Sequence, residues 1–522
     1  MKRYIHSYTL LLTVAIWLLV SCSSHPDVPS SSKAAKCLPA IFPDYCNVTV
    51  PCNIAPLNFM LPADEYEACV ARLTTPDGKQ QTYGDGVKVQ VPLQEWRDML
   101  AAAKGKCIKV EVWGKKQNDE WLSFNPFEIR VAPEPIDDYV SYRLIEPSYV
   151  AWTFMEIAQR NLTSFEETQI FNNEITMNDR EKGQCINCHS YQQFNPQRMQ
   201  FHARQKSGGT IIAYDGDIKK VNMRNDSILS AGVYPAWHPW LKFIVYSTDL
   251  THQSFHTTDP NKIEVFDVES DIIAYDIDRD EVTNLENDTT KFEVFPAWAP
   301  DGRTLYYCSA DFQRQDSTIS KNVEVVLRAT DLHYNIYKKS FDPDTRRFGP
   351  SEPVFIADTL LTAAEGDTLE VQERGMSAVL PRISPDGRYL LFTMGSYGYF
   401  HIWHHDADLW MLDLQTGEAR PLDEVNSPDT ESYHTWSSSG RWIVFSSRRD
   451  DGNYTRPFFA HLDASGHFAK PFELPSADPD YHRQFLRCYN IPEFMLGPVT
   501  ISPQTFADVL KGEGQPVKYV RF

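Results

Sequence analysis

The segment GQCINCHS, residues 183–190, contains the spacing Cys-x-x-Cys-His, which can hold a cofactor or a metal ion. Two thiols at this spacing can each bond covalently to a haem, and the imidazole one residue further on can ligate its iron. The motif therefore predicts one covalent haem c, attached at Cys185 and Cys188 and ligated by His189. With two protein ligands on its iron, such a haem would transfer electrons.

A second axial ligand is expected from nearby or from across the fold. Met199 and His202, in the segment RMQFHAR, lie ten and thirteen residues beyond His189. A thioether would raise the reduction potential of the iron, whereas an imidazole would lower it. We favour His202 over Met199 as the sixth ligand, and an open sixth position is a third alternative.

Other interpretations of the two thiols stay open. A zinc knuckle would need two more ligands at matched spacing, and the sequence contains no second Cys-x-x-Cys pair. A thioredoxin-like pair would need its first cysteine at the start of a helix within a βαβ unit. The pair could also consist of small buried residues without chemistry.

A second cluster, HIWHHDAD at residues 401–408, combines histidine and carboxylate at short range. His401, His404, His405 and Asp406 could ligate a transition metal, or they could fill a loop and hydrogen-bond one another. A catalytic role for His401, His404 and Asp406 is a further alternative. The sequence contains no Gly-x-Ser-x-Gly elbow, no Walker-type phosphate loop and no His-Glu-x-x-His. Hydrolysis therefore has little support, and enzymatic activity is left open.

The N-terminus predicts export. Lys2 and Arg3 precede an apolar run at residues 10–20 that suits a signal peptide and is too short to span a bilayer well. The segment LVSC resembles a bacterial lipobox, which predicts a signal peptide over residues 1–21 and lipid on Cys22. Ser23 favours the outer membrane, with the chain on its periplasmic or cell-surface face, and residues 22–50 are expected to form a tether.

The formal net charge of −20 argues against a nucleic-acid partner. A basic or amphipathic protein partner is favoured instead. The cysteines near the N-terminus could form disulfides, whose connectivity the sequence leaves open.

Two segments with different patterns follow the tether. Residues 51–133 contain short alternating strands at 66–73, 87–91, 108–113 and 127–131 with one helix at 93–104, which predicts a small Ig- or fibronectin-like β-sandwich. The segment APEP at 132–135 predicts a boundary, because proline ends both ladders and helices. Residues 134–207, which carry the Cys-x-x-Cys-His motif, are expected to be helical at 149–160 and 164–174.

The C-terminal part, residues 208–522, repeats. Segments starting at Tyr234, Phe295, Leu380 and Tyr433 share an aromatic residue or leucine, an indole or isoleucine at the fourth place, a tight turn and an aromatic strand. A second hairpin follows each segment. A four-stranded unit repeated with variable insertions is typical of a β-propeller.

The turns of the type SPDGR, followed by a short aromatic strand and a hairpin, resemble the TolB-like propeller repeat over about residues 208–475. The whole arrangement is similar to a group of lipoproteins of the Bacteroides phylum. The resemblance implies a mainly β chain, and the length of the repeated part predicts about six blades. It also supports a second functional hypothesis, a periplasmic or surface protein-interaction scaffold in which Cys-x-x-Cys-His has no redox role.

Overall fold

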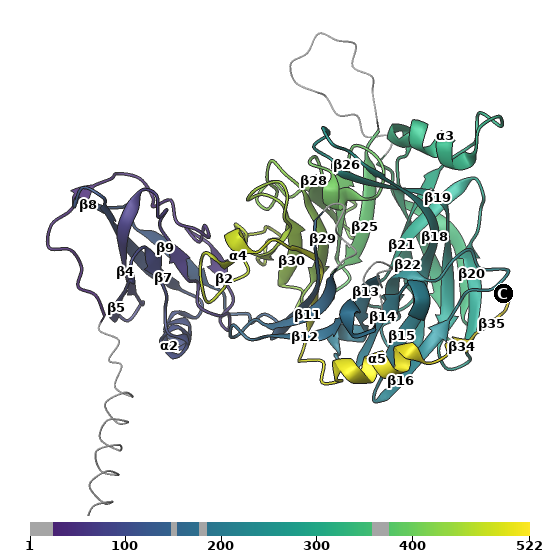
Figure 1. The fold of residues 1–522 in the computed structure, drawn as a ribbon, viewed down its shortest axis with the longest axis horizontal. Helices are drawn as coiled ribbons and strands as arrows, with labels where there is room; N and C mark the ends of the chain where they lie inside the picture. The colour runs from purple at the N-terminus through teal and green to yellow at the C-terminus, as the bar shows by residue number, and fades with distance from the viewer. Residues whose placement is uncertain (1–24, 148–153, 177–184, 358–374, 522) are drawn as a thin grey trace, which may run out of the picture.

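The structure is a computed structural model that describes residues 25–147, 154–176, 185–357 and 375–521. A small N-terminal lobe lies beside a larger β-propeller (Figure 1). Cys22 and the predicted signal peptide, residues 1–21, lie outside the described residues. Among the described residues, no helix has the length and apolar character needed to cross a membrane.

The N-terminal lobe is built on one seven-stranded sheet, whose second layer is a helix and a two-stranded ladder rather than another full sheet. The helix, α2, buries Trp96, Met99 and Leu100 against this sheet. The elements of the lobe are β1 (Lys33–Ala34), β2 (Thr49–Val50), β3 (Phe59–Met60), β4 (Tyr66–Thr74), β5 (Gln80–Tyr83), β6 (Lys88–Val89), α2 (Leu93–Ala103), β7 (Cys107–Lys116), β8 (Trp121–Ser123) and β9 (Phe127–Val131).

The predicted strands and helix of residues 51–133 are present, but the predicted tether is too long. Ile41, Tyr45 and Val48 are buried in the core of the lobe, and β2 pairs with β9 in parallel. Burial of these apolar side chains fixes residues 41–50 to the lobe. The nine cysteines among the described residues are free thiols.

The propeller consists of six four-stranded antiparallel units, which confirms the predicted fold class. Two units share one sheet through a single bridge between β19 and β21. From the innermost strand outward the units are β33 (Cys488–Met495), β10 (Tyr139–Ile145), β11 (Met155–Asn161) and β12 (Glu167–Asn172); β13 (Ile186–Tyr191), β14 (Arg198–Ala203), β15 (Gly209–Tyr214) and β16 (Asp217–Asn222); β17 (Val233–Trp237), β18 (Phe243–Phe255), β19 (Ile263–Asp276) and β20 (Glu281–Glu286); β21 (Lys291–Trp298), β22 (Thr304–Asp311), β23 (Asn335–Asp342) and β24 (Arg347–Phe355); β25 (Ser377–Ile383), β26 (Tyr389–Gly395), β27 (Asp408–Asp413) and β28 (Ala419–Pro421); β29 (Glu431–Trp436), β30 (Trp442–Ser447), β31 (Arg456–His461) and β32 (Phe472–Glu473).

The prediction of a helical segment over residues 134–207 is wrong for the part that the structure describes. The predicted helices at 149–160 and 164–174 coincide with β11 and β12, and the propeller begins at β10 rather than at residue 208. The first unit is completed by β33 from the C-terminal end, which pairs antiparallel with β10. Pairing across about 350 residues overrides the local helical pattern, because strand preference depends on the neighbouring strands.

Short helices and two further strands lie around the units. The C-terminal segment runs along the outside of the propeller, where β34 pairs with β16 and β35 pairs with β20 (Figure 1). These elements are η2 (Asn173–Thr176), η4 (Gln192–Phe194), η5 (Gln205–Ser207), α3 (Lys321–Leu327), η6 (Ala329–Asp331), η7 (His401–Trp403), α4 (Tyr481–Gln484), α5 (Pro503–Lys511), β34 (Gln515–Pro516) and β35 (Lys518–Tyr519).

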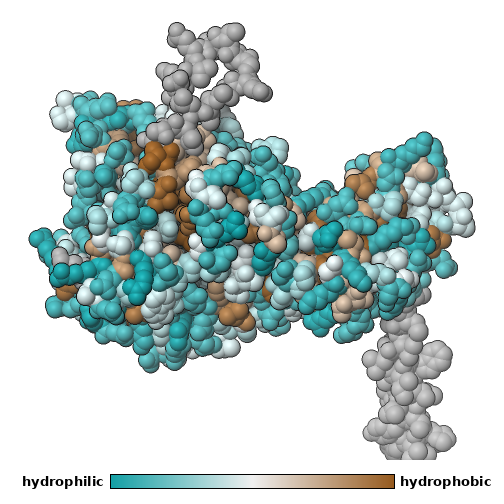
Figure 2. Space-filling view, turned by 180° about the vertical axis from the view of Figure 1, so that it is seen from behind, coloured by the Kyte–Doolittle hydropathy of each residue, from teal (hydrophilic) through white to brown (hydrophobic). Residues whose placement is uncertain are grey.

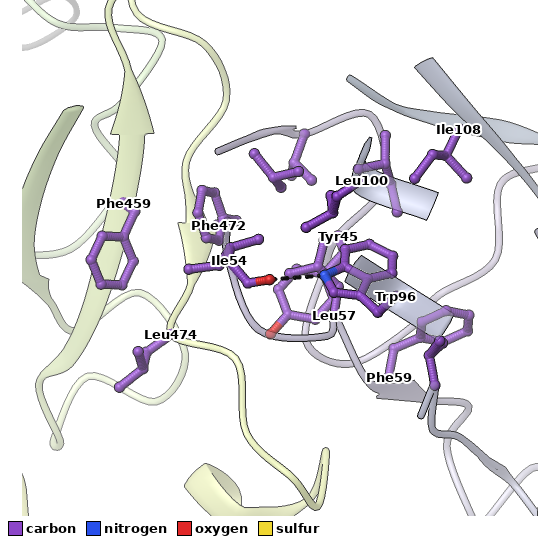
Figure 3. Packing of buried hydrophobic residues seen from close by; sticks show 14 of the residues in the cluster. Tyr45, Ile54, Leu57, Phe59, Trp96, Leu100, Ile108, Phe459, Phe472 and Leu474 are labelled. Carbon is purple, nitrogen blue, oxygen red and sulfur yellow. Dashed lines mark hydrogen bonds between the residues drawn. The ribbon is translucent and has the colours of Figure 1, made fainter. Parts of the chain in front are cut away.

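The core of the N-terminal lobe continues into the propeller. Phe459, Phe472 and Leu474 of the last unit belong to the same buried cluster as Tyr45 and Ile54 (Figure 3). The Arg160 guanidinium donates to the Pro475 carbonyl at 2.9 Å across this region. Figure 2 shows that the outer surface, seen from the back, is mainly hydrophilic. The apolar side chains therefore pack mainly in this shared core and between the units.

Candidate functional site: the axial cavities of the propeller

The innermost strand of every unit carries the same β-bulge. At each bulge two residues oppose one residue of the neighbouring strand, and the first of the two has a positive φ. Non-glycine residues rarely adopt this conformation, so its repetition is a built feature of the ring. The six residues are Cys188 (57°), Tyr234 (47°), Phe295 (54°), Leu380 (58°), Tyr433 (45°) and Ile491 (54°).

The Cys188-His189 dipeptide occupies this repeated position. Four of the six bulges continue with proline, and the other two continue with His189 and His434. His434 has a structural partner, because its Nε2 lies 3.1 Å from the Leu391 carbonyl oxygen. Cys188 and His189 of the Cys-x-x-Cys-His motif therefore occupy a position of the propeller repeat that needs no cofactor.

Three cavities follow one another through the middle of the ring. The bulge cavity, about 30 Å³, is lined by all six bulge residues. On one side it adjoins the mouth cavity, about 140 Å³, with which it shares Tyr234 and Tyr433. On the other side it adjoins a cavity of about 200 Å³, with which it shares Arg382 and Glu493. Together they trace the axis of the propeller.

The motif residues do not face one common space. Cys185 lines the mouth cavity, whereas Cys188 and His189 line the bulge cavity. The exposed fractions of the three residues are 5%, 3% and 1%. Burial raises the pKa of the Cys188 thiol to about 11 and lowers the pKa of His189 to about 3. The thiol is thus protonated and the imidazole neutral at neutral pH.

His189 is the strongest remaining argument for a ligand role. The carbonyl oxygens of Ser141 and Ile491 face its ring, yet neither ring nitrogen makes a hydrogen bond of normal geometry. Buried polar groups usually have partners. The ring of Tyr191, 6.3 Å away between centroids, packs at its edge.

The two candidates for a sixth ligand lie outside the axial cavities. Met199 packs between strands in a buried cluster with Phe171 and Phe201. His202 sits opposite Asn187 in the ladder, and its Nδ1 lies 3.1 Å from the Thr210 hydroxyl. Burial lowers the pKa of His202 to about 3.

The described residues do not fit a haem. No axial cavity touches both motif thiols and the imidazole. Neither Met199 nor His202 faces the bulge cavity. Covalent haem therefore stays a prediction of the motif alone.

The histidine cluster of residues 401–408 makes hydrogen bonds that hold a neighbouring hairpin in place. His404 Nε2 lies 2.9 Å from a Glu264 carboxylate oxygen, and the Tyr397 hydroxyl donates to the other oxygen at 2.7 Å. His401 Nε2 lies 3.2 Å from the Tyr397 carbonyl oxygen. Within the described ranges, no three His, Cys, Asp or Glu side chains are grouped to hold a metal ion. The cluster thus ties the long β18–β19 hairpin to η7.

This hairpin forms one wall of the mouth cavity. Thr251, Gln253, Ile263 and Val265 line the cavity from the part of the hairpin that extends beyond the ring. A second contact fixes the same hairpin, since His405 Nε2 lies 3.1 Å from the Pro260 carbonyl oxygen. Contacts from His404 and from His405 therefore both hold this wall of the mouth cavity.

Sequence reasoning missed the charged groups of the mouth cavity. Arg143, Arg204 and Arg448 line it, together with the carboxylates of Glu146 and Asp249. Each arginine lies on or just after the second strand of its unit, namely β10, β14 or β30. No local spacing marks these residues, but the ends of equivalent strands meet at one face of a propeller, so their repeat positions could have identified them.

Comparisons with known proteins give the fold and little more. No protein-family model matches the chain, and no curated protein matches it significantly. Solved structures with some similarity include a puromycin-hydrolysing peptidase from Mycobacterium tuberculosis (11% identity, 64% of this chain and 54% of that chain, TM-score 0.32). Others are an oligogalacturonate lyase from Vibrio parahaemolyticus (11%, 63% and 100%, TM-score 0.30) and an auxiliary nutrient binding protein from Bacteroides thetaiotaomicron (11%, 80% and 99%, TM-score 0.29). The chain spans about half the length of the peptidase, and similarities this distant do not identify a ligand.

Proposed function

We propose that this chain is an exported binding scaffold that takes a small ligand into the mouth cavity of its propeller. Lipid on Cys22 would hold it at the outer membrane, and the protein partner expected from the sequence would dock on the propeller. The observation that carries the proposal is the mouth cavity, to which strands of several units contribute polar, charged and aromatic side chains. Concave sites with a few convergent polar groups are typical binding sites.

The repeat position of Cys188 and His189 supports a scaffold over an electron carrier. Their side chains help to fill the ring at a bulge where the other units place Tyr234, Phe295 or Leu380. On this proposal Cys-x-x-Cys-His is a structural segment of β13.

We expect no covalent haem when the full chain is co-expressed with a cytochrome c maturation system and exported to a periplasm. The measurement is the pyridine haemochrome spectrum of the denatured protein, beside a Cys185→Ser, Cys188→Ser double variant and a reference cytochrome. If the wild type shows a haemochrome band that the double variant loses, the scaffold proposal is wrong about this motif. Electron transfer would then become the leading function.

We expect at least one ligand class to raise the melting temperature of the wild-type chain in a panel of peptides, sugars, nucleotides and organic acids. Binding to the native state alone stabilises it by about 2.7 kcal/mol at a hundredfold excess over Kd. Thr251→Trp should abolish this increase by filling the mouth cavity from the exposed hairpin face.

Thr289→Trp is the matched control, because Thr289 lines a separate surface cavity away from the axis. It should leave the ligand-induced increase unchanged. An increase that survives in Thr251→Trp would place the binding site elsewhere. If no compound in the panel raises the melting temperature of the wild-type chain, the result counts against the proposal as a whole.

A further inference from the structure

We infer that the mouth cavity recognises an oxyanion, a carboxylate or phosphate group of the ligand, through Arg143 and Arg204. The inference rests on the proposed binding function and names the chemical class of its ligand. It draws on the contacts of three arginines, on the charges around them and on the aromatic walls of the cavity.

Arg143 is a buried cation with unused hydrogen-bonding capacity. It is 8% exposed, and its Nε has no hydrogen-bond partner among the described residues. A terminal nitrogen lies 3.1 Å from the Asn490 side-chain oxygen in the amide orientation that satisfies both groups. Leaving a buried guanidinium donor unpaired costs free energy, and this guanidinium belongs to a residue that lines the mouth cavity.

Arg448 adds a second positive charge, which interacts electrostatically with Asp429 and Asp451. It is 1% exposed, its Nε donates to the Ile402 carbonyl at 2.7 Å, and another nitrogen donates to the Asn453 carbonyl. Its guanidinium carbon lies 3.5 Å from the centroid of the Trp403 ring. Carbonyl groups and a ring hold this cation in place, so its charge still acts on the cavity.

Arg204 brings a third guanidinium to the same wall, where it is exposed to solvent. Burial raises the pKa of the neighbouring Asp249 carboxyl, and the charge of Arg204 opposes that increase. Among the lining residues that the structure describes, three arginines stand against Glu146 and Asp249, in a chain whose overall formal net charge is −20. A positive cavity in a strongly acidic protein favours an anion over a cation at this place.

The remaining walls suit an organic body attached to the anion. Tyr234, Tyr399, Phe400, Trp403 and Tyr433 supply rings, and the apolar side chains of Ile263 and Val265 close the hairpin side. Asn187 and Asn490 provide amides beside the arginines. Arginine is well suited to the group itself, because its planar fork matches both carboxylate and phosphate oxygens.

The test is isothermal titration calorimetry on the full chain with three probes: benzoate, its uncharged isostere benzamide, and inorganic phosphate. We expect benzoate or phosphate to bind and benzamide not to bind. Benzoate alone would indicate a carboxylate ligand, and phosphate alone a phosphate ligand. Arg143→Gln should weaken anion binding by about 10- to 100-fold, the loss expected for one charge-assisted hydrogen bond.

Arg347→Gln is the matched control, since it removes the same charge from an exposed position on the outer strand β24. It should change binding little. If Arg143→Gln does not fold, Arg204→Gln replaces it, because Arg204 is exposed and can be exchanged without emptying a core.

Three outcomes overturn the inference: no binding of either anion at millimolar concentration, equal binding of benzamide, or unchanged affinity in the arginine variants. The failure of the wider proposal looks different. If the panel yields a neutral ligand that Thr251→Trp excludes and Arg143→Gln tolerates, only the anion specificity is wrong. If Thr251→Trp excludes nothing, the mouth cavity is not the binding site, and the proposal fails at that point.

Discussion

Replacing Trp96 with alanine should lower the free energy of unfolding by about 3–5 kcal/mol, the usual cost of truncating a large buried aromatic residue. Trp96 is 1% exposed in the core of the N-terminal lobe. Its indole Nε1 also donates to the Ile54 carbonyl at 3.0 Å, and the variant would leave that acceptor unpaired (Figure 3). Chemical denaturation followed by circular dichroism measures the change.

Leu327→Ala is the control for this variant. Leu327 is 72% exposed on α3, so its truncation creates no cavity and should change stability by less than about 0.5 kcal/mol. A similar loss in both variants would contradict the role assigned to the core.

The same experiment also tests the contact between the lobes. Tyr45 and Ile54 share their buried cluster with Phe472 and Leu474 of the propeller, which predicts that the two lobes unfold together in the wild type. Two separate transitions, with only the first moved by Trp96→Ala, would show that this interface contributes little. A single transition would show that the N-terminal lobe is a fixed part of the scaffold.

Glu264→Leu should release the β18–β19 hairpin from η7. The variant leaves His404, which is 0% exposed, and the Tyr397 hydroxyl without their acceptor. Leaving a buried hydrogen-bonding group without its partner costs about 1–3 kcal/mol. Because the pair holds one wall of the mouth cavity, amide hydrogen exchange should increase in the extended part of the hairpin, and ligand affinity should fall with it.

Glu269→Leu is the matched control on the same strand. Glu269 is exposed, so the same substitution there removes a carboxylate without removing the acceptor of a buried hydrogen bond. Hydrogen exchange in the hairpin, measured by mass spectrometry, should increase in Glu264→Leu and stay unchanged in Glu269→Leu. Unchanged exchange in Glu264→Leu would mean that the backbone ladder alone holds the hairpin, and the histidine cluster would lose its assigned role.

The contrast between two parts of the chain shows where local pattern suffices. In the repeats from Tyr234 onward, strands such as β17 and β18 or β25 and β26 pair with the next strand along the chain through a short turn, so periodicity and turn residues predicted the elements. Residues 155–172 carry a pattern that also fits a helix. Their strand conformation depends on β10, which is itself completed by β33 from the other end of the chain.

The cysteine motif illustrates the same limit for a site. Its spacing is visible in the sequence, but the bulge at Cys188 directs Cys188 and His189 to one cavity while Cys185 lines another. A bulge is a property of a paired strand, and the spacing of residues does not reveal it.

The sequence by itself determined the repeated four-stranded unit and four strands and the helix of the N-terminal lobe, because each depends on neighbours within a few tens of residues. Only the tertiary structure decided which units close the ring and which side chains meet on its axis. Arg143, Arg204 and Arg448 are far apart in the chain and share no motif. They converge because equivalent strands of a propeller end at the same face, where their charges can act on one ligand.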